Sequence, residues 1–500
     1  MRVFDDIVVG SGVSGLTMSL LLAMNGRKVL LLEKNPRIGG SLSRFSKKGA
    51  PFDTGFHFTG GLQKGGLLYD MLSVLGIRDA IEPVFLSEDN ANSFFIESEN
   101  RTYNVPYGIQ RMKDQLKEYF PKESAAIDGY FDRVLDVCEK TPSMNLHSLT
   151  ANQSHINEDF IALEEVLNGL TDNRSLRAVL CGFAMCYGVR PDEISFANHS
   201  RICIGLYESV ARVREGGTAF ENAFKKKLTE YGVDIACNTH IVELADIHGK
   251  KVGRFILSSG EEVTAQNCIF TIHPKEILKV LPQEYLSRAF QDRVSSFESS
   301  TGFFSLFALL DEGQEEPNFG ETIVSILPHT DITRQLDPPS QGPSALVVIK
   351  SREDGGDKKQ NVICALEPSS HEHVQQWKDT TVGKRPQAYL DYKQQRIDAM
   401  TERIFSVFPN YKGHLHVVDS ASVLTFRDYL NNYDGSAYGV KQKLGQYNLR
   451  GRLPLHNLHA AGQSALLPGV IGAMMSSFIV ARALIPEEQY NGFLRKNVCS

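Results

Sequence analysis

The sequence predicts an α/β fold, and three observations near its N-terminus support this prediction. Residues 7–9 form a short, wholly apolar run, which is typical of a strand buried on both faces of a parallel sheet. A loop with glycines at positions 10, 12 and 15 follows at once, and residues 16–24 are typical of a helix. A second apolar run, residues 29–32, then ends in Glu33. This order of strand, glycine loop, helix, strand and acid indicates a Rossmann-like dinucleotide-binding unit.

Each position of the glycine loop has an expected role. Gly10 permits the tight turn, Gly12 lets the backbone approach a pyrophosphate, and Gly15 lets the helix pack closely on the strand. The N-terminus of the helix offers unpaired N–H groups and the positive end of its dipole to phosphate groups. The acid that ends the second strand accepts hydrogen bonds from a ribose hydroxyl. The expected dinucleotide contacts of this unit are Gly10, Ser11, Gly12, Ser14, Gly15, Glu33 and Lys34.

The residues after the acid favour FAD over NAD. An NAD-binding domain usually continues from the acid into another helix, whereas residues 34–41 contain a second glycine pair, Gly39 and Gly40. A long, extended cofactor needs a second loop at which the backbone comes close, and this pair can supply it. We therefore predict that the cofactor is FAD, with Gly40 and Ser41 among its contacts.

A second part of the predicted cofactor site lies near the C-terminus. Residues 458–462 are typical of a strand that ends at a glycine, and residues 471–484 are typical of a helix. The N-terminus of that helix, directed at the N1–C2=O edge of a flavin, would stabilise the anionic reduced ring. The expected contacts here are Gly462, Gln463, Gly469, Val470 and Ile471.

These motifs resemble those of the phytoene desaturase, carotenoid isomerase and retinol saturase family of FAD-dependent oxidoreductases, and they are closest to retinol saturase. The resemblance covers most of the chain and is weakest between about residues 275 and 420. Further similar segments are residues 52–58, 120–123, 187–199, 433–439 and 457–473. The resemblance also implies that the strand at 239–242 contacts the adenine, with Val242 as the expected residue.

The chain is more distantly similar to amine oxidases, in which an arginine usually follows the double glycine and holds the pyrophosphate. Ser41 stands at that position here; Arg44 could take the role, or it could equally be a solvated arginine. Many relatives also carry Asp after the glycine that ends the last strand, where this chain has Gln463, as in saturase-like members. These departures favour a polyene substrate over an amine.

The resemblance implies a glutathione-reductase-like FAD-binding domain with an inserted α+β substrate domain. The FAD-binding domain is expected at residues 1–90, 205–295 and 415–500, and the substrate domain at 91–204 and 296–414.

The two insertions differ in their apolar patterns. Residues 107–140 and 155–185 of the first insertion have apolar spacings that are typical of helices. Four apolar runs of the second insertion are typical of strands, namely residues 303–310, 322–327, 345–349 and 362–366. The charged segment 352–359 between the last two runs is expected to be a hairpin tip.

The resemblance implies an enzyme that saturates, desaturates or isomerises carbon–carbon double bonds of an apolar polyene or isoprenoid lipid. A flavin amine oxidase and a non-catalytic, FAD-stabilised lipid-binding protein are the alternatives. His57 follows a segment that the resemblance places near the flavin ring, so that it could donate a proton or position the substrate. A structural histidine bonded to the backbone is an equal explanation. Tyr187, His199 and Tyr438 are further candidates of the same kind.

Composition and charge narrow the range of partners. A net charge of −6 argues against a nucleic-acid partner, because nothing in the sequence would neutralise a run of phosphates.

Neither a signal peptide nor an apolar run long enough to span a membrane stands out, so that we expect a cytoplasmic protein. An apolar substrate would require peripheral contact with a membrane, and a redox reaction would require an electron donor or acceptor. His371 and His373 lack a third ligand, so that no metal site is expected.

Overall fold

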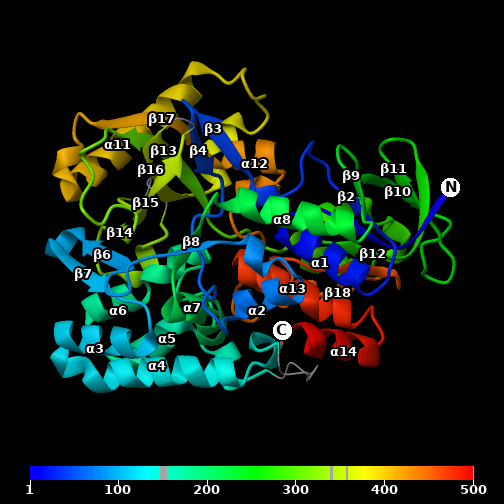
Figure 1. The fold of residues 1–500 in the computed structure, drawn as a ribbon, viewed down its shortest axis with the longest axis horizontal. Helices are drawn as coiled ribbons and strands as arrows, with labels where there is room; N and C mark the ends of the chain where they lie inside the picture. The colour runs from blue at the N-terminus through cyan, green and yellow to red at the C-terminus, as the bar shows by residue number, and fades with distance from the viewer. Residues whose placement is uncertain (147–154, 338–341, 356–357, 499–500) are drawn as a thin grey trace.

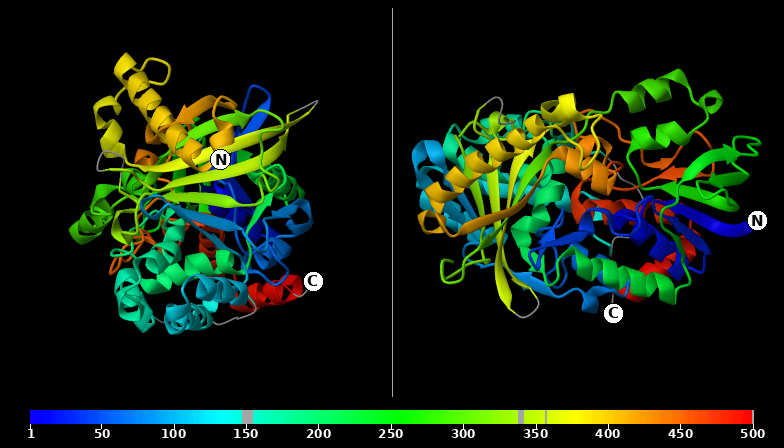
Figure 2. Two further views of the ribbon diagram at one scale, coloured as in Figure 1. Left: turned by 90° about the vertical axis from the view of Figure 1, so that its left-hand side faces the viewer. Right: turned by 90° about the horizontal axis from the view of Figure 1, so that it is seen from above.

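The chain folds around two large β-sheets that lie side by side with their own helices (Figure 1). The computed structural model describes residues 1–146, 155–337, 342–355 and 358–498. The polypeptide passes between the two parts several times, so that each sheet is assembled from segments far apart in the sequence (Figures 1 and 2).

The first sheet contains the predicted dinucleotide-binding unit. In the described residues it has eight strands, and its main path runs β10-β11-β12-β1-β2-β9. Strands β12, β1, β2 and β9 are parallel to one another, and β19 joins β12 in parallel as well. The strands of this sheet are β1 (Arg2–Val9), β2 (Val29–Leu32), β9 (Asp234–Ala236), β10 (Ile241–Ala245), β11 (Arg254–Leu257), β12 (Glu262–Phe270), β18 (Gly451–Arg452) and β19 (Leu458–Ala460). The strands predicted at residues 7–9 and 29–32 are therefore confirmed.

Helix α1 packs against both α8 and α13 and is buried almost all round, which explains why it has no polar face. The helices of this part are α1 (Val13–Met24), α2 (Leu67–Val74), α8 (Gly217–Glu230), α9 (Pro274–Val280), α10 (Arg288–Ser295), α13 (Gly469–Arg482) and α14 (Glu487–Val498). The helices predicted at residues 16–24 and 471–484 are confirmed, although they begin slightly earlier, at Val13 and Gly469.

The second sheet is mainly antiparallel and has the order β17-β13-β16-β15-β14-β6-β7. Its strands are β6 (Asn92–Ile96), β7 (Arg101–Val105), β13 (Gly302–Leu310), β14 (Ile323–Leu327), β15 (Leu346–Asp354), β16 (Lys359–Ser369) and β17 (Leu415–Ala421). All four strands predicted in the second insertion are present. Strands β15 and β16 extend beyond the predicted runs, so that the hairpin tip is shorter than 352–359, and residues 356 and 357 lie outside the described residues.

Helices cover both faces of the second sheet. Along β15, Val347 and Ile349 pack with helices α3 to α7, whereas Leu346 and Val348 point to the opposite face and pack with α11. This alternation is the two-residue period of a strand that is buried on both sides. The helices are α3 (Ile109–Tyr119), α4 (Ser124–Glu139), α5 (Leu163–Leu170), α6 (Arg174–Leu180), α7 (Phe196–Glu208) and α11 (Gln387–Val407). None of the described helices combines the length and apolar character that crossing a bilayer requires.

Short elements connect the two parts, and a strand of the second sheet corrects a predicted boundary. They are β3 (Arg44–Lys47), β4 (Ala50–Asp53), β5 (Pro83–Phe85), β8 (Ala211–Val213) and α12 (Val423–Leu430). The boundary predicted at residue 415 falls too early, because β17 (Leu415–Ala421) pairs with β13 of the second sheet. The backbone hydrogen bonds of β17 therefore assign it to the inserted part.

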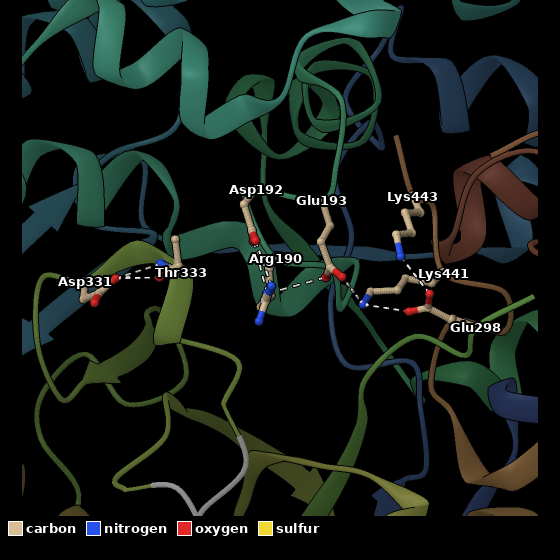
Figure 3. Close-up of polar contacts among 8 residues, drawn as sticks. All are labelled: Arg190, Asp192, Glu193, Glu298, Asp331, Thr333, Lys441 and Lys443. Atoms are coloured by element: carbon tan, nitrogen blue, oxygen red, sulfur yellow. Dashed lines mark hydrogen bonds and ion pairs between the residues drawn. The ribbon is translucent and has the colours of Figure 1, made fainter. Parts of the chain in front are cut away.

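A chain of ion pairs fixes the segment that precedes β18. Lys441 contacts Glu193 at 2.6 Å and Glu298 at 3.5 Å, and Lys443 contacts Glu298 at 2.7 Å. Figure 3 shows these contacts, together with the pair between Arg190 and Asp192 beside them. Three segments that are far apart in the sequence thus meet at one place. Both lysines are neutralised by carboxylates there.

Candidate functional site

A cleft opens at the carboxyl ends of the parallel strands, where ligands bind in sheets of this type. The glycine loop, the second glycine pair and the start of α13 line it together. The predicted cofactor contacts that line the cleft are Gly10, Ser11, Gly12, Ser14, Glu33, Lys34, Gly40, Ser41, Gln463, Gly469 and Val470.

The three loop glycines have different surroundings. Gly10 has a φ of +95°, which favours glycine. A Cβ on Gly15 would lie 1.8 Å from the carbonyl oxygen of Gly10, so that only glycine lets α1 pack this closely. A Cβ on Gly12 would meet nothing within 4 Å, so that the space beside it is open. Gly40, with a φ of +56°, lies opposite, and its Cβ would be 3.1 Å from the Cα of Gly12.

The carboxylate of Glu33 is held at the end of β2 by backbone N–H groups. The N–H group of Ser11 donates to Oε2 at 2.9 Å, and the N–H group of Asn35 donates to Oε1 at 2.7 Å. Since an ionised carboxylate can accept about four hydrogen bonds, Glu33 can still accept one from a ligand hydroxyl.

Four predicted contacts do not line this cleft. Gly15 lies in the first turn of α1 and faces the carbonyl group of Gly10, and the N–H group of Gly462 donates to Ser476 Oγ at 2.9 Å. Ile471 lines a second cavity instead. Val242 lies at a register shift between β10 and β11 and is 52% exposed. The preceding residues, Thr239 and His240, line the cleft in its place.

A second cavity adjoins the dinucleotide cleft, and its walls are mainly apolar. Its apolar side chains include Phe58, Phe94, Phe183, Leu206, Phe303 and Leu366. The two cavities share five lining residues, which we call the junction: Gly55, Phe56, Tyr438, Gly469 and Val470. Helix α13 begins at the junction, and the N–H groups of its first turn have no partners within the helix. An apolar molecule in this cavity would therefore lie next to the dinucleotide cleft.

Sequence comparison finds relatives of this chain, some of which match it over most of its length. Residues 8–75 match the NAD(P)-binding Rossmann-like domain family. The chain is 26% identical over 527 residues to an all-trans-retinol 13,14-reductase from Danio rerio, covering 96% of this chain and 86% of that protein. It is 23% identical over 337 residues to a chloroplastic prolycopene isomerase from Daucus carota, covering 61% and 52% of the two chains. The chain fits the retinol saturase and carotenoid isomerase family.

Solved structures share the fold of this chain. An oxidoreductase from Methanosarcina mazei has a TM-score of 0.68 at 14% identity and covers 96% of this chain and 100% of its own. Cyclohexylamine oxidase from Brevibacterium oxydans has a TM-score of 0.60 at 16% identity, with 99% of each chain covered. At these identities the likeness shows a shared fold alone.

His57 lines the apolar cavity next to the junction. Burial and the nearby guanidinium of Arg44 lower the pKa of His57 to about 4, so that the imidazole is neutral at pH 7. Among the described residues, the ring of His57 has no hydrogen-bond partner. The structure therefore does not support the alternative of a histidine bonded to the backbone. A neutral imidazole here can orient a ligand but is a poor source of an imidazolium proton.

Two of the other candidates belong to a buried network and reach neither cavity. His199 Nε2 lies 2.6 Å from the hydroxyl of Tyr130, and His199 Nδ1 lies 2.9 Å from the hydroxyl of Tyr187. Burial lowers the pKa of His199 to about 3. Since both candidates are fully buried within α-helical packing, they are structural residues. Tyr438, by contrast, lies at the junction, with its hydroxyl donating to the carbonyl oxygen of Met185 at 2.8 Å.

Arg44 is neither solvated nor in the dinucleotide cleft. Its guanidinium contacts Asp53 at 2.8 Å and Glu353 at 2.9 Å, and all three side chains are largely buried. The arginine thus joins the β3–β4 hairpin to β15, and it does not line the cleft. The suggestion that it replaces the missing pyrophosphate-binding arginine is therefore wrong.

Some residues of the site were not among the predicted contacts, although Gly55 and Phe56 lie in the similar segment 52–58. Gly55 and Phe56 belong to the junction, and His273 lines the cleft just after β12. The ends of neighbouring parallel strands meet at one edge of a sheet, so that polar residues directly after predicted strands were the available signal for His273.

Proposed function

We propose that the protein is an FAD-dependent oxidoreductase that acts on carbon–carbon double bonds of an apolar polyene or isoprenoid lipid. The observation that supports this most directly is the junction, where a mainly apolar cavity meets the dinucleotide cleft. Relatives named as a retinol 13,14-reductase and a prolycopene isomerase support the same substrate class, since retinol and prolycopene are both conjugated polyenes.

The residues of the cleft fit FAD. The open space beside Gly12, facing Gly40, would admit the pyrophosphate, and the carboxylate of Glu33 would accept a hydrogen bond from the ribose. The start of α13, with Gly469 and Gln463, would lie by the flavin end. When bound, FAD supplies the hydride-transfer chemistry that these side chains lack.

The protein's own residues would bind and orient the substrate. The apolar walls would hold a polyene chain against the junction and exclude water from it. Negative charge that develops in the reaction would be stabilised by the N-terminus of α13. His57, neutral at pH 7, would position the substrate by packing its aromatic ring against the polyene chain. Charge on a conjugated chain is spread over several carbons, so that such a site needs few charged groups.

A flavin amine oxidase fits the cavity less well. Among the described residues that line the apolar cavity there is no Asp or Glu to pair with an ammonium group, and Arg201 is already paired with Asp159 at 2.5 Å. A non-catalytic FAD-stabilised protein is the remaining alternative, and a relative from Danio rerio, 22% identical, is itself named an inactive all-trans-retinol 13,14-reductase.

Anaerobic flavin spectroscopy tests the three alternatives in one experiment. The flavin is reduced chemically, and retinol, a carotenoid or an amine is then added. Reoxidation by a polyene with a product two hydrogens heavier identifies a saturase, and a product of unchanged mass but new geometry identifies an isomerase. Bleaching of the oxidised protein by a partly saturated polyene identifies a desaturase. Bleaching by an amine alone would overturn the proposal, and no reaction with any compound would favour the non-catalytic alternative.

We also propose peripheral contact with a membrane at an exposed aromatic rim. Phe160 and Tyr447 are 55% and 60% exposed and line a polar cavity that shares Arg201 and Leu467 with the apolar one. Aromatic side chains favour the interface of a bilayer. Liposome flotation of the wild type and of a Phe160→Ser, Tyr447→Ser variant tests this: the wild type should float and the variant should not.

A further inference from the structure

His273 lies next to the glycine loop, at the end of β12. The hydroxyl of Thr271 donates to the carbonyl oxygen of Gly10 at 3.1 Å. A Cβ on Gly10 would lie 2.8 Å from the side chain of Ile272. The end of β12 thus contacts the turn that is expected to bind a pyrophosphate. His273 is the next residue, and it lines the same cleft as the glycine loop.

The imidazole of His273 carries a donor group that has no partner. Its Nδ1 accepts a hydrogen bond from the N–H group of Lys275 at 3.2 Å. Burial and the ammonium groups of Lys275 and Lys279 lower the pKa of His273 to about 3, so that the ring is neutral. A neutral imidazole that accepts at Nδ1 bears its proton on Nε2. Within the described residues this Nε2 is buried and makes no hydrogen bond.

Neighbouring groups fix the ring and favour an anionic ligand. The ring of His273 stacks on that of Tyr433, with centroids 4.6 Å apart and an interplanar angle of 13°. The Nζ atoms of Lys275 and Lys279 lie 5.3 and 6.0 Å from the centroid of the Tyr433 ring. Lys279 also pairs with Glu276 at 2.6 Å, so that Lys275 contributes most of the local positive potential. A buried N–H donor in a positive environment suits a phosphate oxygen.

Among the described residues that line the cleft there is no arginine to bind a pyrophosphate. Ser41 stands where an arginine is usual in amine oxidases, Arg44 is committed to two carboxylates, and Lys34 is exposed. A side-chain donor at the loop would therefore add to the binding of the phosphates.

We propose that His273 is a cofactor-binding residue whose Nε2–H group donates a hydrogen bond to the FAD pyrophosphate. The inference rests on the proposed FAD-dependent function. Since the acceptor is charged, loss of this bond should weaken cofactor binding roughly tenfold to a hundredfold.

Two substitutions separate the donor at Nε2 of His273 from the acceptor at Nδ1, which caps the N-terminus of α9. Asparagine can still accept from the N–H group of Lys275 but places no N–H group at the Nε2 position, and glutamine does the reverse. We would measure the dissociation constants of FAD and of ADP for flavin-free wild-type protein, His273→Asn and His273→Gln. Thermal unfolding of the flavin-free proteins checks that each variant folds.

The proposal expects His273→Asn to lose about tenfold or more in affinity for both FAD and ADP, and His273→Gln to stay within about threefold of the wild type. Unchanged affinity in His273→Asn would overturn it. If His273→Asn lost affinity for FAD but not for ADP, the contact would belong to the flavin half of the cofactor. If both variants lost affinity equally, the role of His273 would be structural. Either result would overturn the proposal. A wild type that binds neither ligand would overturn the proposed function itself, which is a separate outcome.

Discussion

The hydroxyl of Ser14 on α1 lies 2.7 Å from the hydroxyl of Ser477 on α13, although the two residues are 463 positions apart. Ser477 also donates to the carbonyl oxygen of Ser14 at 2.8 Å, so that the Ser14 hydroxyl is the donor in the first bond. Both side chains are buried. The pair fixes the relative position of two helices whose N-termini both line the candidate cofactor cleft.

We expect the Ser14–Ser477 pair to stabilise the folded protein measurably. Ser477→Ala should lower the free energy of unfolding by about 1–2 kcal/mol, because it leaves buried groups of Ser14 unpaired. Urea unfolding of Ser14→Ala, Ser477→Ala and the double variant, all without flavin, completes the cycle. A coupling energy of about 1 kcal/mol is expected. Strict additivity of the two single effects would contradict a direct interaction.

Gly12 and Gly15 should respond in opposite ways to substitution by alanine. The Cβ of Gly15→Ala would lie 1.8 Å from a backbone oxygen, so that we expect severe destabilisation or failure to fold. The Cβ of Gly12→Ala would meet nothing within 4 Å, so that the flavin-free protein should unfold near the wild-type temperature. That methyl group would nevertheless occupy the space proposed for the pyrophosphate, and bound FAD should be lost. Flavin content and thermal unfolding measure the two effects; a Gly12→Ala variant that retains full FAD would contradict the proposed binding mode.

The sequence was most informative where local pattern and chemistry agree. The strand, glycine loop and helix at residues 2–24 follow from apolar periodicity and from turns that only glycine permits, so that they could be predicted without knowledge of distant contacts. Val242 was less predictable, because a one-residue register shift reverses the direction of a side chain in a strand.

The apolar cavity could not be derived from the sequence, because its walls combine segments that lie far apart along the chain. The junction joins Gly55 and Phe56 to Tyr438, which are separated by nearly the whole inserted part. Phe303 lines the cavity whereas the next residue, Phe304, packs under α11 on the other face of the sheet. The ion pair of Arg44 could not be predicted either, since its partner Glu353 lies on a strand far away in the sequence.

Arg44→Met should destabilise the protein without altering its affinity for FAD. The substitution removes the cation that bridges Asp53 and Glu353 and leaves the longer contact of Arg212 with Glu353 at 3.8 Å, so that the loss should be about 3 kcal/mol. Arg44→Lys should lose less, since it keeps the charge but cannot bridge both carboxylates. Urea unfolding gives the stabilities, and titration with FAD gives the affinities. A large loss of FAD affinity in the folded Arg44→Met protein would contradict this prediction and indicate that Arg44 contributes to cofactor binding.

Buried neutral histidines should make the protein lose stability in mild acid. The pKa of His199 is about 3 in the folded protein, against about 6.5 when unfolded, so that below pH 6.5 the unfolded chain binds a proton that the folded protein does not. Stability is therefore retained above pH 6.5 and falls with acidification, by about 1.4 kcal/mol per pH unit for this group. His199→Gln should reduce that slope by one proton between pH 4 and 6. Tyr187→Phe is the control, since it removes a bond to His199 but keeps the titrating ring, and its slope should match the wild type.

His57 should act without changing its own charge near neutral pH. With a pKa of about 4, its imidazole is neutral throughout the range from pH 5.5 to 8, and a proton titration followed by NMR should give a midpoint near that value. If it positions the polyene, His57→Gln should raise KM more than it lowers kcat, because glutamine keeps a donor and an acceptor without the aromatic ring. The pH profile of kcat should be the same in both proteins.

Tyr438→Phe is the matched control at the junction, since it removes a polar group whose hydrogen bond goes to the backbone. An ionisation between pH 6 and 7 that is present in the wild type and lost in His57→Gln would show instead that His57 is the proton donor, and that its charged form is stabilised when substrate is bound.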